Sequence, residues 1–474
     1  MNVGGINAGV EVHDPAVYVK NDKYYLFGTH MTLAESDDLR YFKLLAGGEN
    51  KENPLFENLF TDNMEAFSYC GSFNDTGEWA VWAPDVVYLE SLKKYVMYFC
   101  LSGSYVKSNI CMATADNLTG PYRFERRLIY SGFNEATIDQ TNFEEITGSR
   151  DISKYIKKNG NYNNLNWPNA IDPNVFKDKD GELWLVYGSW SGGIFLLKID
   201  KNTGLLVHPK EDAKNRIDRY FGKKLIGGGH KSIEGPCIIY DDELDYYYLF
   251  VSYGRLKREG GYQIRVFRSK KPDGPYLDML GKTFTRVSHH EPYGLKLIGN
   301  YILPSNDIAY KSPGHNSLFK DEDGNIYCVY HQRFDNGTEH FEPRVHQVFR
   351  TGSNWLAISP FATSGEMHIQ KSYLEAEVSG TYYMLEHGLD ISNHVNEAKK
   401  VRFEMDHNIY LIDDNETKTD IGVYKLSDHG LISIIVNDTK YDGVIIQQID
   451  EAKNPTMCIT AVGENQSFWA VKYI

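Results

Sequence analysis

A segment with one plan recurs five times between residues 13 and 332. Each copy has a polar or acidic head, a short apolar strand, a polar turn, and a second strand rich in Tyr, Leu and Val. The copies are HDPAVYVKNDKYYLFGTH from His13, APDVVYLESLKKYVMYFC from Ala83, IDPNVFKDKDGELWLVYGS from Ile171, EGPCIIYDDELDYYYLFVSYG from Glu234 and HNSLFKDEDGNIYCVYHQ from His315. This repeat constrains the fold strongly, because each copy must form the same supersecondary unit.

Each copy is predicted to form a β-hairpin. The patterns of residues 172–176 (DPNVF) and 183–187 (LWLVY) are typical of half-buried and buried strands. Residues 178–181 (DKDG) between them have the composition of a tight hairpin turn. The copies are far enough apart for each to belong to a four-stranded antiparallel blade. We therefore predict an all-β fold built on a five-bladed β-propeller rather than on a β-sandwich.

The repeat stops near residue 362. Beyond it the chain consists of short strand-like segments separated by turns: GTYYMLEHG, KVRFEMDHNIYLI, TDIGVYKL, GLISIIVND, YDGVIIQQI, MCITAVG and FWAVKYI. We therefore predict two domains, a propeller over residues 1–362 and a small C-terminal β-sandwich or barrel over residues 363–474.

Three of the repeat heads carry an acid that a hairpin does not require: Asp14, Asp172 and Glu234. Equivalent strand starts converge around the axis of a propeller at one mouth, so we expect these side chains to lie together. A fourth acid, Asp85, sits one place further along its copy. A ring of carboxylates can bind a metal, hold a sugar, or perform acid and base catalysis. Hydrolysis of a glycosidic bond needs one protonated carboxyl group and one ionised carboxylate.

The triplet of motifs HDP at Asp14, IDP at Asp172 and IEGP at Glu234 resembles glycoside hydrolase family 43. The resemblance implies a hydrolase that inverts the anomeric carbon. It implies that Asp14 is the general base, that Asp172 modulates the pKa of the acid and positions the substrate, and that Glu234 is the general acid. Retaining propellers of the invertase and levansucrase type are not favoured, because Ile171 and Gly235 replace their Arg and Cys.

Further motifs resemble one branch of that family, the endo-α-1,5-L-arabinanases. They are WAPDV from Trp82, NWPNAIDPNVF from Asn166, VYGSWSGGIFLL from Val186 and SPGHNSLF from Ser312. The tail resembles the C-terminal domain of the extracellular two-domain arabinanases, and it either binds sugar or supports the propeller. The resemblance implies cleavage of internal α-1,5 bonds of arabinan. Two alternatives stay open: an exo-acting α-L-arabinofuranosidase or β-xylosidase, and a non-catalytic carbohydrate-binding propeller.

The same resemblance implies one metal ion at the propeller axis, which we expect to be calcium, with His315 as a ligand and water in most other positions. One imidazole is unusual for a hard ion that takes about six to eight oxygen ligands. The candidate substrate-binding residues are His13, Trp82, Asn169, Ser189 and Trp190. For the two tryptophans, packing between blades is the alternative role.

The formal net charge of −14 argues against a nucleic-acid partner, which needs an excess of Lys and Arg. No apolar run is long enough to span a membrane, and the start MNVGGINAGVEVHDP lacks the features of a signal peptide. The six cysteines form no C-x-x-C pair, which favours buried free thiols. We expect a monomer that is secreted or periplasmic and whose leader is absent from this sequence, with a cytoplasmic location as the alternative.

Overall fold

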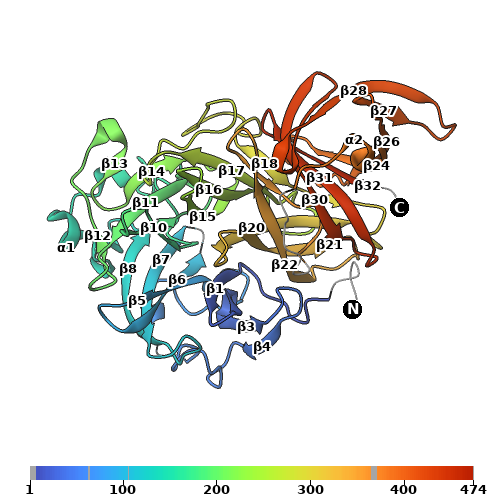
Figure 1. The fold of residues 1–474 in the computed structure, drawn as a ribbon. Helices are drawn as coiled ribbons and strands as arrows, with labels where there is room; N and C mark the ends of the chain where they lie inside the picture. Colours follow the sequence, from blue (N-terminus) through green and yellow to red (C-terminus); the bar gives the residue numbers. More distant parts are fainter. Residues whose placement is uncertain (1–6, 62–63, 105, 364–370, 473–474) are drawn as a thin grey trace.

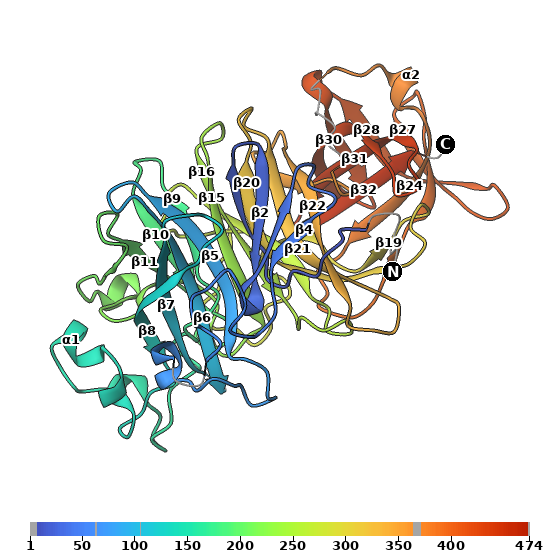
Figure 2. The same ribbon diagram turned by 90° about the horizontal axis from the view of Figure 1, so that it is seen from below.

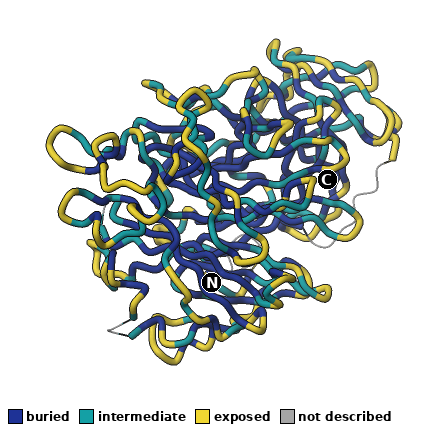
Figure 3. The backbone as a smooth tube through the Cα atoms, turned by 90° about the vertical axis from the view of Figure 1, so that its left-hand side faces the viewer, coloured by how far each residue is buried: buried dark blue, intermediate teal, exposed yellow. Residues whose placement is uncertain are grey.

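The computed structural model describes residues 7–61, 64–104, 106–363 and 371–472. These residues form a ring of five antiparallel blades and a smaller closed barrel that packs against one side of the ring (Figure 1). The prediction of an all-β, five-bladed propeller followed by a small β-domain is confirmed, and the small domain is a barrel rather than a sandwich. The exposed residues lie mostly in the connecting loops (Figure 3).

Each blade is built largely from one continuous stretch of chain. Blade I contains β1 (Ala16–Lys20), β2 (Lys23–Gly28), β3 (Thr32–Ser36) and β4 (Lys43–Ala46), and blade II contains β5 (Val81–Leu89), β6 (Lys94–Ser104), β7 (Lys107–Ala115) and β8 (Arg123–Ser131). Blade III contains β9 (Asn174–Lys177), β10 (Leu183–Tyr187), β11 (Ile194–Ile199), β12 (Leu206–Val207), β13 (Ile217–Asp218) and β14 (Gly222–Ile226). Blade IV contains β15 (Ile233–Asp241), β16 (Tyr246–Tyr253), β17 (Gln263–Ser269) and β18 (Leu295–Ile298). Blade V contains β19 (Tyr301–Ile302), β20 (Tyr310–Lys320), β21 (Ile326–Phe334), β22 (Phe341–Arg350) and β23 (Leu356–Ile358).

The C-terminal domain is a closed antiparallel barrel. Its strands are β24 (Gly380–His387), β26 (Lys399–Phe403), β27 (Asn408–Ile412), β28 (Lys418–Leu426), β29 (Leu431–Val436), β30 (Thr439–Ile449), β31 (Pro455–Gly463) and β32 (Gln466–Lys472). A short strand in a barrel loop, β25 (Asn396–Glu397), pairs instead with β19 of blade V. The described α-helices are short, α1 (Phe143–Thr147) between blades II and III and α2 (Glu375–Val378) before the barrel.

The first hairpin illustrates why these residues form strands and turns. β1 and β2 pair up to Lys20 and Lys23, which leaves a two-residue turn. The turn residues Asn21 and Asp22 both have left-handed backbone conformations, with φ of 52° and 56°. A turn of this type matches the right-handed twist of the strands, and Asn and Asp tolerate it better than most residues.

Hydrogen bonds join the innermost strands of neighbouring blades at the junctions II–III, III–IV and V–I; four of these strands, β5, β9, β15 and β20, are labelled in Figure 2. The bonds run from the backbone N–H of Val175 to Asp85 (2.6 Å), of Ile238 to Asn174 (3.3 Å) and of Val17 to Ser317 (3.1 Å). Asp85, the fourth acid of the repeat, thus accepts a hydrogen bond that links blade II to blade III. Burial raises the pKa of Asp85 to about 7.

The ring closes where the N-terminal segment packs on blade V. Ala8 donates its backbone N–H to Glu342 Oε2 at 3.1 Å, and Ala8 and Val12 share one buried cluster with Phe319 and Val345. The segment that carries Asp14 is therefore fixed by the last blade, although it lies close to the beginning of the sequence.

The barrel and the propeller share one hydrophobic core. Trp469 of β32 is fully buried, and its indole N–H donates to the carbonyl of Ile358 at 3.0 Å. The Trp469 ring also contacts Tyr301 of blade V, with ring centroids 5.1 Å apart. The predicted domain boundary at residues 362/363 falls between β23 and α2. The shared core contains residues from both sides of this boundary.

Replacing Trp469 with Ala should destabilise the whole protein, because the change leaves a cavity at this shared core. We expect the free energy of unfolding to fall by about 3–5 kcal/mol, as for other buried aromatic truncations. Urea unfolding followed by circular dichroism measures this. A loss below about 1 kcal/mol would be too small for the truncation of a buried aromatic residue. It would show that the two domains are not coupled through Trp469.

The cysteine prediction is largely confirmed. All six cysteines, each within the described residues, are free, and five are buried while Cys70 is half-buried. No helix in the described part of the chain is long and apolar enough to span a membrane.

Candidate active site

Each innermost strand of the propeller contains, or closely follows, a residue in the left-handed backbone conformation. These residues are Asp14, Ala83, Asp172, Gly235 and His315, with φ between 32° and 56°. The conformation costs about 1–2 kcal/mol for a residue with a Cβ atom, so the surrounding blades must hold it. Glu234 and Asp85 do not occupy this position: Glu234 lies one residue before Gly235, and Asp85 lies two residues after Ala83.

The three predicted catalytic acids nevertheless lie in one cavity of about 380 Å³ at the mouth of the propeller. The cavity is lined by His13, Asp14, Asn74, Asp75, Thr76, Trp82, Ser102, Gly103, Ser104, Val106, Asn169, Ile171, Asp172, Glu234, Leu256 and His315. Several blades contribute to this wall, as expected if the strand starts converge on the axis. Asp85 is not part of it.

Asp14 is buried and surrounded by hydrogen-bond donors. Thr29 Oγ1 donates to its Oδ2 at 2.6 Å, and its Oδ1 lies 2.8 Å from His13 Nδ1 and 3.0 Å from His315 Nδ1. Burial alone would raise the pKa of Asp14, but His13 and His315 outweigh burial and hold the pKa well below the usual value. Asp14 is therefore ionised at neutral pH.

Glu234 has the opposite electrostatic environment. Burial raises its pKa above the usual value, and the negative charge of Asp14 adds to the effect. Hydrogen bonds from Tyr262 and Ser189 oppose the rise, and Ser189 Oγ lies 2.9 Å from Glu234 Oε2. The pKa values of two acids in one cavity are thus shifted in opposite directions. The shift favours the ionised form of Asp14 and the protonated form of Glu234, as acid–base catalysis requires.

Asp172, like Glu234, has a raised pKa. Burial, together with the charges of Glu234 and Asp14, raises its pKa to about 7, against the opposing effect of His315. Its Oδ2 accepts the backbone N–H of Gly235 at 3.1 Å, so Asp172 is also linked to the strand that carries Glu234.

His315 faces the acids. Burial would lower the pKa of this imidazole, but the three carboxylates, Asp14 foremost, raise it to about 9. The field that favours the protonated imidazole also favours a bound cation. With Nδ1 directed at Asp14, Nε2 is the His315 nitrogen left for a metal. The next side chain, Asn316, has both amide atoms buried without a hydrogen-bond partner among the described residues. These features fit a cation held through one imidazole and water.

A second group of side chains that could bind a metal lies beside His315. The ligand atoms of His13, Asp14 and His331 all lie within 4.8 Å of one another. Two imidazoles and one carboxylate suit calcium poorly, because this ion prefers oxygen ligands. His331 Nδ1 moreover accepts the backbone N–H of Asp14 at 3.4 Å. The predicted ligand, His315, fits calcium better than this group does.

The predicted substrate-binding residues separate into two groups. His13, Trp82 and Asn169 line the cavity. Ser189 is buried behind Glu234 and donates to it. Trp190 is absent from the described wall of the cavity, and its ring packs near His230 with centroids 5.3 Å apart.

Sequence reasoning missed several residues of the site. Thr29 and Tyr262 contact the acids from outside the repeat heads, and residues 74–76 and Leu256 line the cavity from loops. None of these carries a sequence signal of its own, because their contacts with the acids depend on how the chain folds and not on a local pattern.

The chain matches the model of glycosyl hydrolases family 43 over residues 149–355 and the model of a C-terminal lipocalin-like domain over residues 360–470. It is 35% identical to the extracellular endo-α-(1→5)-L-arabinanase 2 of Bacillus subtilis (strain 168), over 98% of this chain and 93% of that protein. It is 36% identical to the extracellular endo-α-(1→5)-L-arabinanase of Thermotoga petrophila, over 97% and 93% of the two chains. The crystal structure of the endo-1,5-α-L-arabinanase from Thermotoga petrophila RKU-1 superposes with a TM-score of 0.84 at 33% identity, over 99% of each chain.

Proposed function

The chain belongs to glycosyl hydrolase family 43, and on that premise we propose that it is an endo-α-1,5-L-arabinanase that hydrolyses internal bonds of arabinan with inversion at the anomeric carbon. The observation that carries this proposal is the pairing of Asp14 and Glu234 in one cavity with pKa values shifted in opposite directions. The choice of sugar and of endo action is supported by the two relatives that match over nearly the whole chain.

In this proposal Glu234 is the general acid. Burial raises the pKa of its carboxyl group and favours the protonated form, which can donate a proton to O5 of the departing arabinose unit as the C1–O5 bond breaks. Without that proton the leaving group would depart as an alkoxide, which is a far poorer leaving group. Ser189 holds the carboxyl group through its hydrogen bond to Oε2.

Asp14 is the general base. Its carboxylate accepts a proton from a water molecule while that water attacks C1 from the face opposite the leaving group. The donors Thr29, His13 and His315 stabilise the ionised form and fix its direction. The water oxygen ends on the sugar with inverted configuration, and both carboxyl groups return to their starting protonation states through solvent.

Asp172 modulates this pair and positions the sugar. Like-charge repulsion couples Asp172 to Glu234 and raises the pKa of Asp172. His13, Trp82 and Asn169, which line the same cavity, are proposed to contact the substrate.

We propose calcium as the metal at the axis, with His315 Nε2 as its protein ligand. When bound, the ion supplies positive charge close to the carboxylates. Calorimetric titration of chelator-treated protein with Ca²⁺ tests this, with His315→Ala as the comparison. Equal binding by the two proteins would contradict the assignment.

The relatives are extracellular proteins by name. We propose that this chain too is secreted and acts as a monomer on arabinan outside the cell.

Replacing Ser189 with Ala removes a hydrogen bond that lowers the pKa of Glu234. The alkaline limb of the pH profile of kcat/KM on arabinan should therefore move to higher pH, because Glu234 stays protonated longer. Asp172→Asn should move the same limb to lower pH, since it removes a nearby negative charge. A shift of both variants in one direction would contradict the assignment of Glu234 as the acid.

Substrate choice is tested by measuring reducing ends released from linear arabinan, xylan and aryl glycosides. The proposal predicts the highest kcat/KM on linear arabinan. Preference for an aryl β-xyloside would identify a β-xylosidase, and binding of arabinan without any release of reducing ends would identify a non-catalytic propeller.

A further inference from the structure

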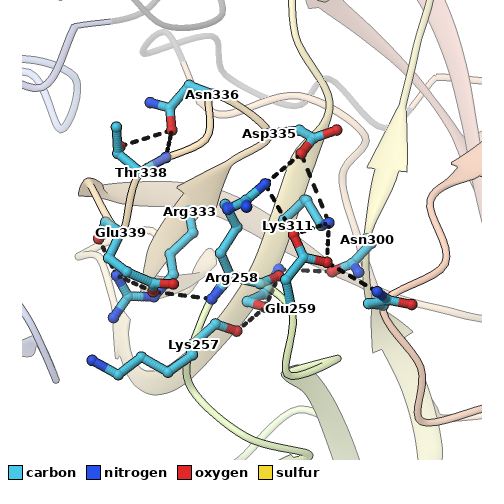
Figure 4. Close-up of polar contacts among 12 residues, drawn as sticks. Lys257, Arg258, Glu259, Asn300, Lys311, Arg333, Asp335, Asn336, Thr338 and Glu339 are labelled. Carbon is cyan, nitrogen blue, oxygen red and sulfur yellow. Dashed lines mark hydrogen bonds and ion pairs between the residues drawn. The ribbon is translucent and has the colours of Figure 1, made fainter.

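Residues 254–261, within the loop between β16 and β17, form the segment called the cleft loop. Leu256 of this loop lines the cavity beside the catalytic acids. The side chains that hold the loop come from blade V, from the loop itself and from the barrel. Figure 4 shows Arg258 and Lys311 directed at Glu259, and Arg333 beside Glu339.

On the propeller side, Arg333 of β21 joins the cleft loop to the acids. Its Nε donates to the carbonyl of Leu256 at 2.7 Å, and its Nη2 lies 3.3 Å from His13 Nε2. The other ring nitrogen of His13 lies 2.8 Å from Asp14 Oδ1. The guanidinium group of Arg333 therefore contacts both the cleft loop and His13, the neighbour of Asp14.

Glu259 anchors the outer part of the cleft loop. The buried ammonium of Lys311 lies 3.0 Å and 2.9 Å from its two oxygens, and Arg258 Nη1 lies 2.9 Å from Oε1. A third donor comes from the C-terminal domain, because Asn393 Nδ2 lies 2.9 Å from Glu259 Oε2. Arg258 is held in turn by Asp335 at 2.8 Å.

Asn393 belongs to a barrel loop, residues 388–397, that is itself fixed to blade IV. The carbonyl of Leu389 accepts from the buried Arg265 at 2.7 Å, and the carbonyl of Asp390 accepts from the buried Lys296 at 3.0 Å. At the end of the cleft loop, a Cβ atom on Gly261 would lie 2.5 Å from the carbonyl oxygen of Ser392. The two loops therefore touch through their backbones.

We propose that the barrel positions the cleft loop through the Asn393–Glu259 contact, and that the C-terminal domain in this way takes part in binding the polysaccharide. Asn393 and Glu259 are positioning residues, since neither lines the described cavity. This inference rests on the proposed function for its kinetic readout, and the mobility of the cleft loop tests it independently.

The experiment uses Asn393→Ala in the full-length protein. Asn393 is exposed, so the variant should fold. We expect KM for linear arabinan to rise about fivefold or more, the lower range of coupling between sites, with little change in kcat. Hydrogen exchange of residues 254–261, followed by mass spectrometry, should accelerate by a similar factor. The matched control is Ser392→Ala, whose hydroxyl bonds Asp390 and His394 within the same barrel loop, and it should match the wild type in both measurements.

A double-mutant cycle with Glu259→Ala distinguishes an effect through the Asn393–Glu259 contact from an unspecific loss of structure. If Asn393 acts through Glu259, the double variant should be no worse than Glu259→Ala alone. Unchanged exchange in Asn393→Ala, or a double variant whose loss is the product of the two single losses, would overturn the inference. A wild-type protein without activity on arabinan would overturn the proposed function instead, while the exchange comparison would still decide the link.

Discussion

Glu234→Gln is expected to lower kcat on linear arabinan by about 10³-fold, within the range that a positioned general acid contributes. The amide keeps the size of the side chain and can still accept from Ser189, but its N–H protons are not acidic enough to be transferred to O5. Initial rates of reducing-end release measure the loss, and circular dichroism checks that the variant is folded.

The leaving group provides the control for this variant. An aryl α-L-arabinofuranoside with a nitrophenolate leaving group needs little protonation, so Glu234→Gln should retain much more of its wild-type rate on this substrate than on arabinan. Equal losses on both substrates would show that Glu234 acts in binding or folding rather than as the acid.

Asp14→Asn is expected to lower kcat by a similar factor of about 10³, because an amide cannot accept the proton of the attacking water. This loss should persist on the aryl substrate, since activation of water is required for any leaving group. The two variants therefore predict different patterns across the two substrates. Recovery of Asp14→Asn on the aryl substrate would contradict its role as the base.

Reaction in dilute methanol distinguishes a base from a nucleophile at Asp14. An inverting enzyme forms no covalent sugar intermediate, so the wild type should release arabinose units with free reducing ends and no methyl arabinofuranoside. Accumulation of the methyl glycoside would indicate a covalent intermediate and therefore retention.

The propeller was predictable because its repeat combines periodic strands with turn residues that have few alternatives, as at residues 178–181. The barrel was predictable only as strands and turns, since closure depends on β24 meeting β32, a pairing that no local pattern encodes. In blade IV the sequence did not reveal that Gly235, rather than the acid Glu234, takes the left-handed position.

The catalytic acids were predictable from their motifs, but their division of labour was not visible in the residues alone. The low pKa of Asp14 depends on His315, and the hydrogen bonds of Glu234 depend on Ser189 and Tyr262. His315 and Ser189 come from other blades than the acids they contact, whereas Tyr262 follows β16 in the same blade as Glu234. No local sequence pattern encodes either kind of contact. The contact between Asn393 and Glu259 is likewise long-range and has no sequence signal.

The size distribution of early products from linear arabinan tests the central claim most directly. Chromatography at a few per cent conversion should show a mixture of arabino-oligosaccharides of several lengths, because cleavage occurs at internal bonds. Release of a single small product from the first time points would contradict endo action and would identify an exo-acting enzyme with the same three carboxylates.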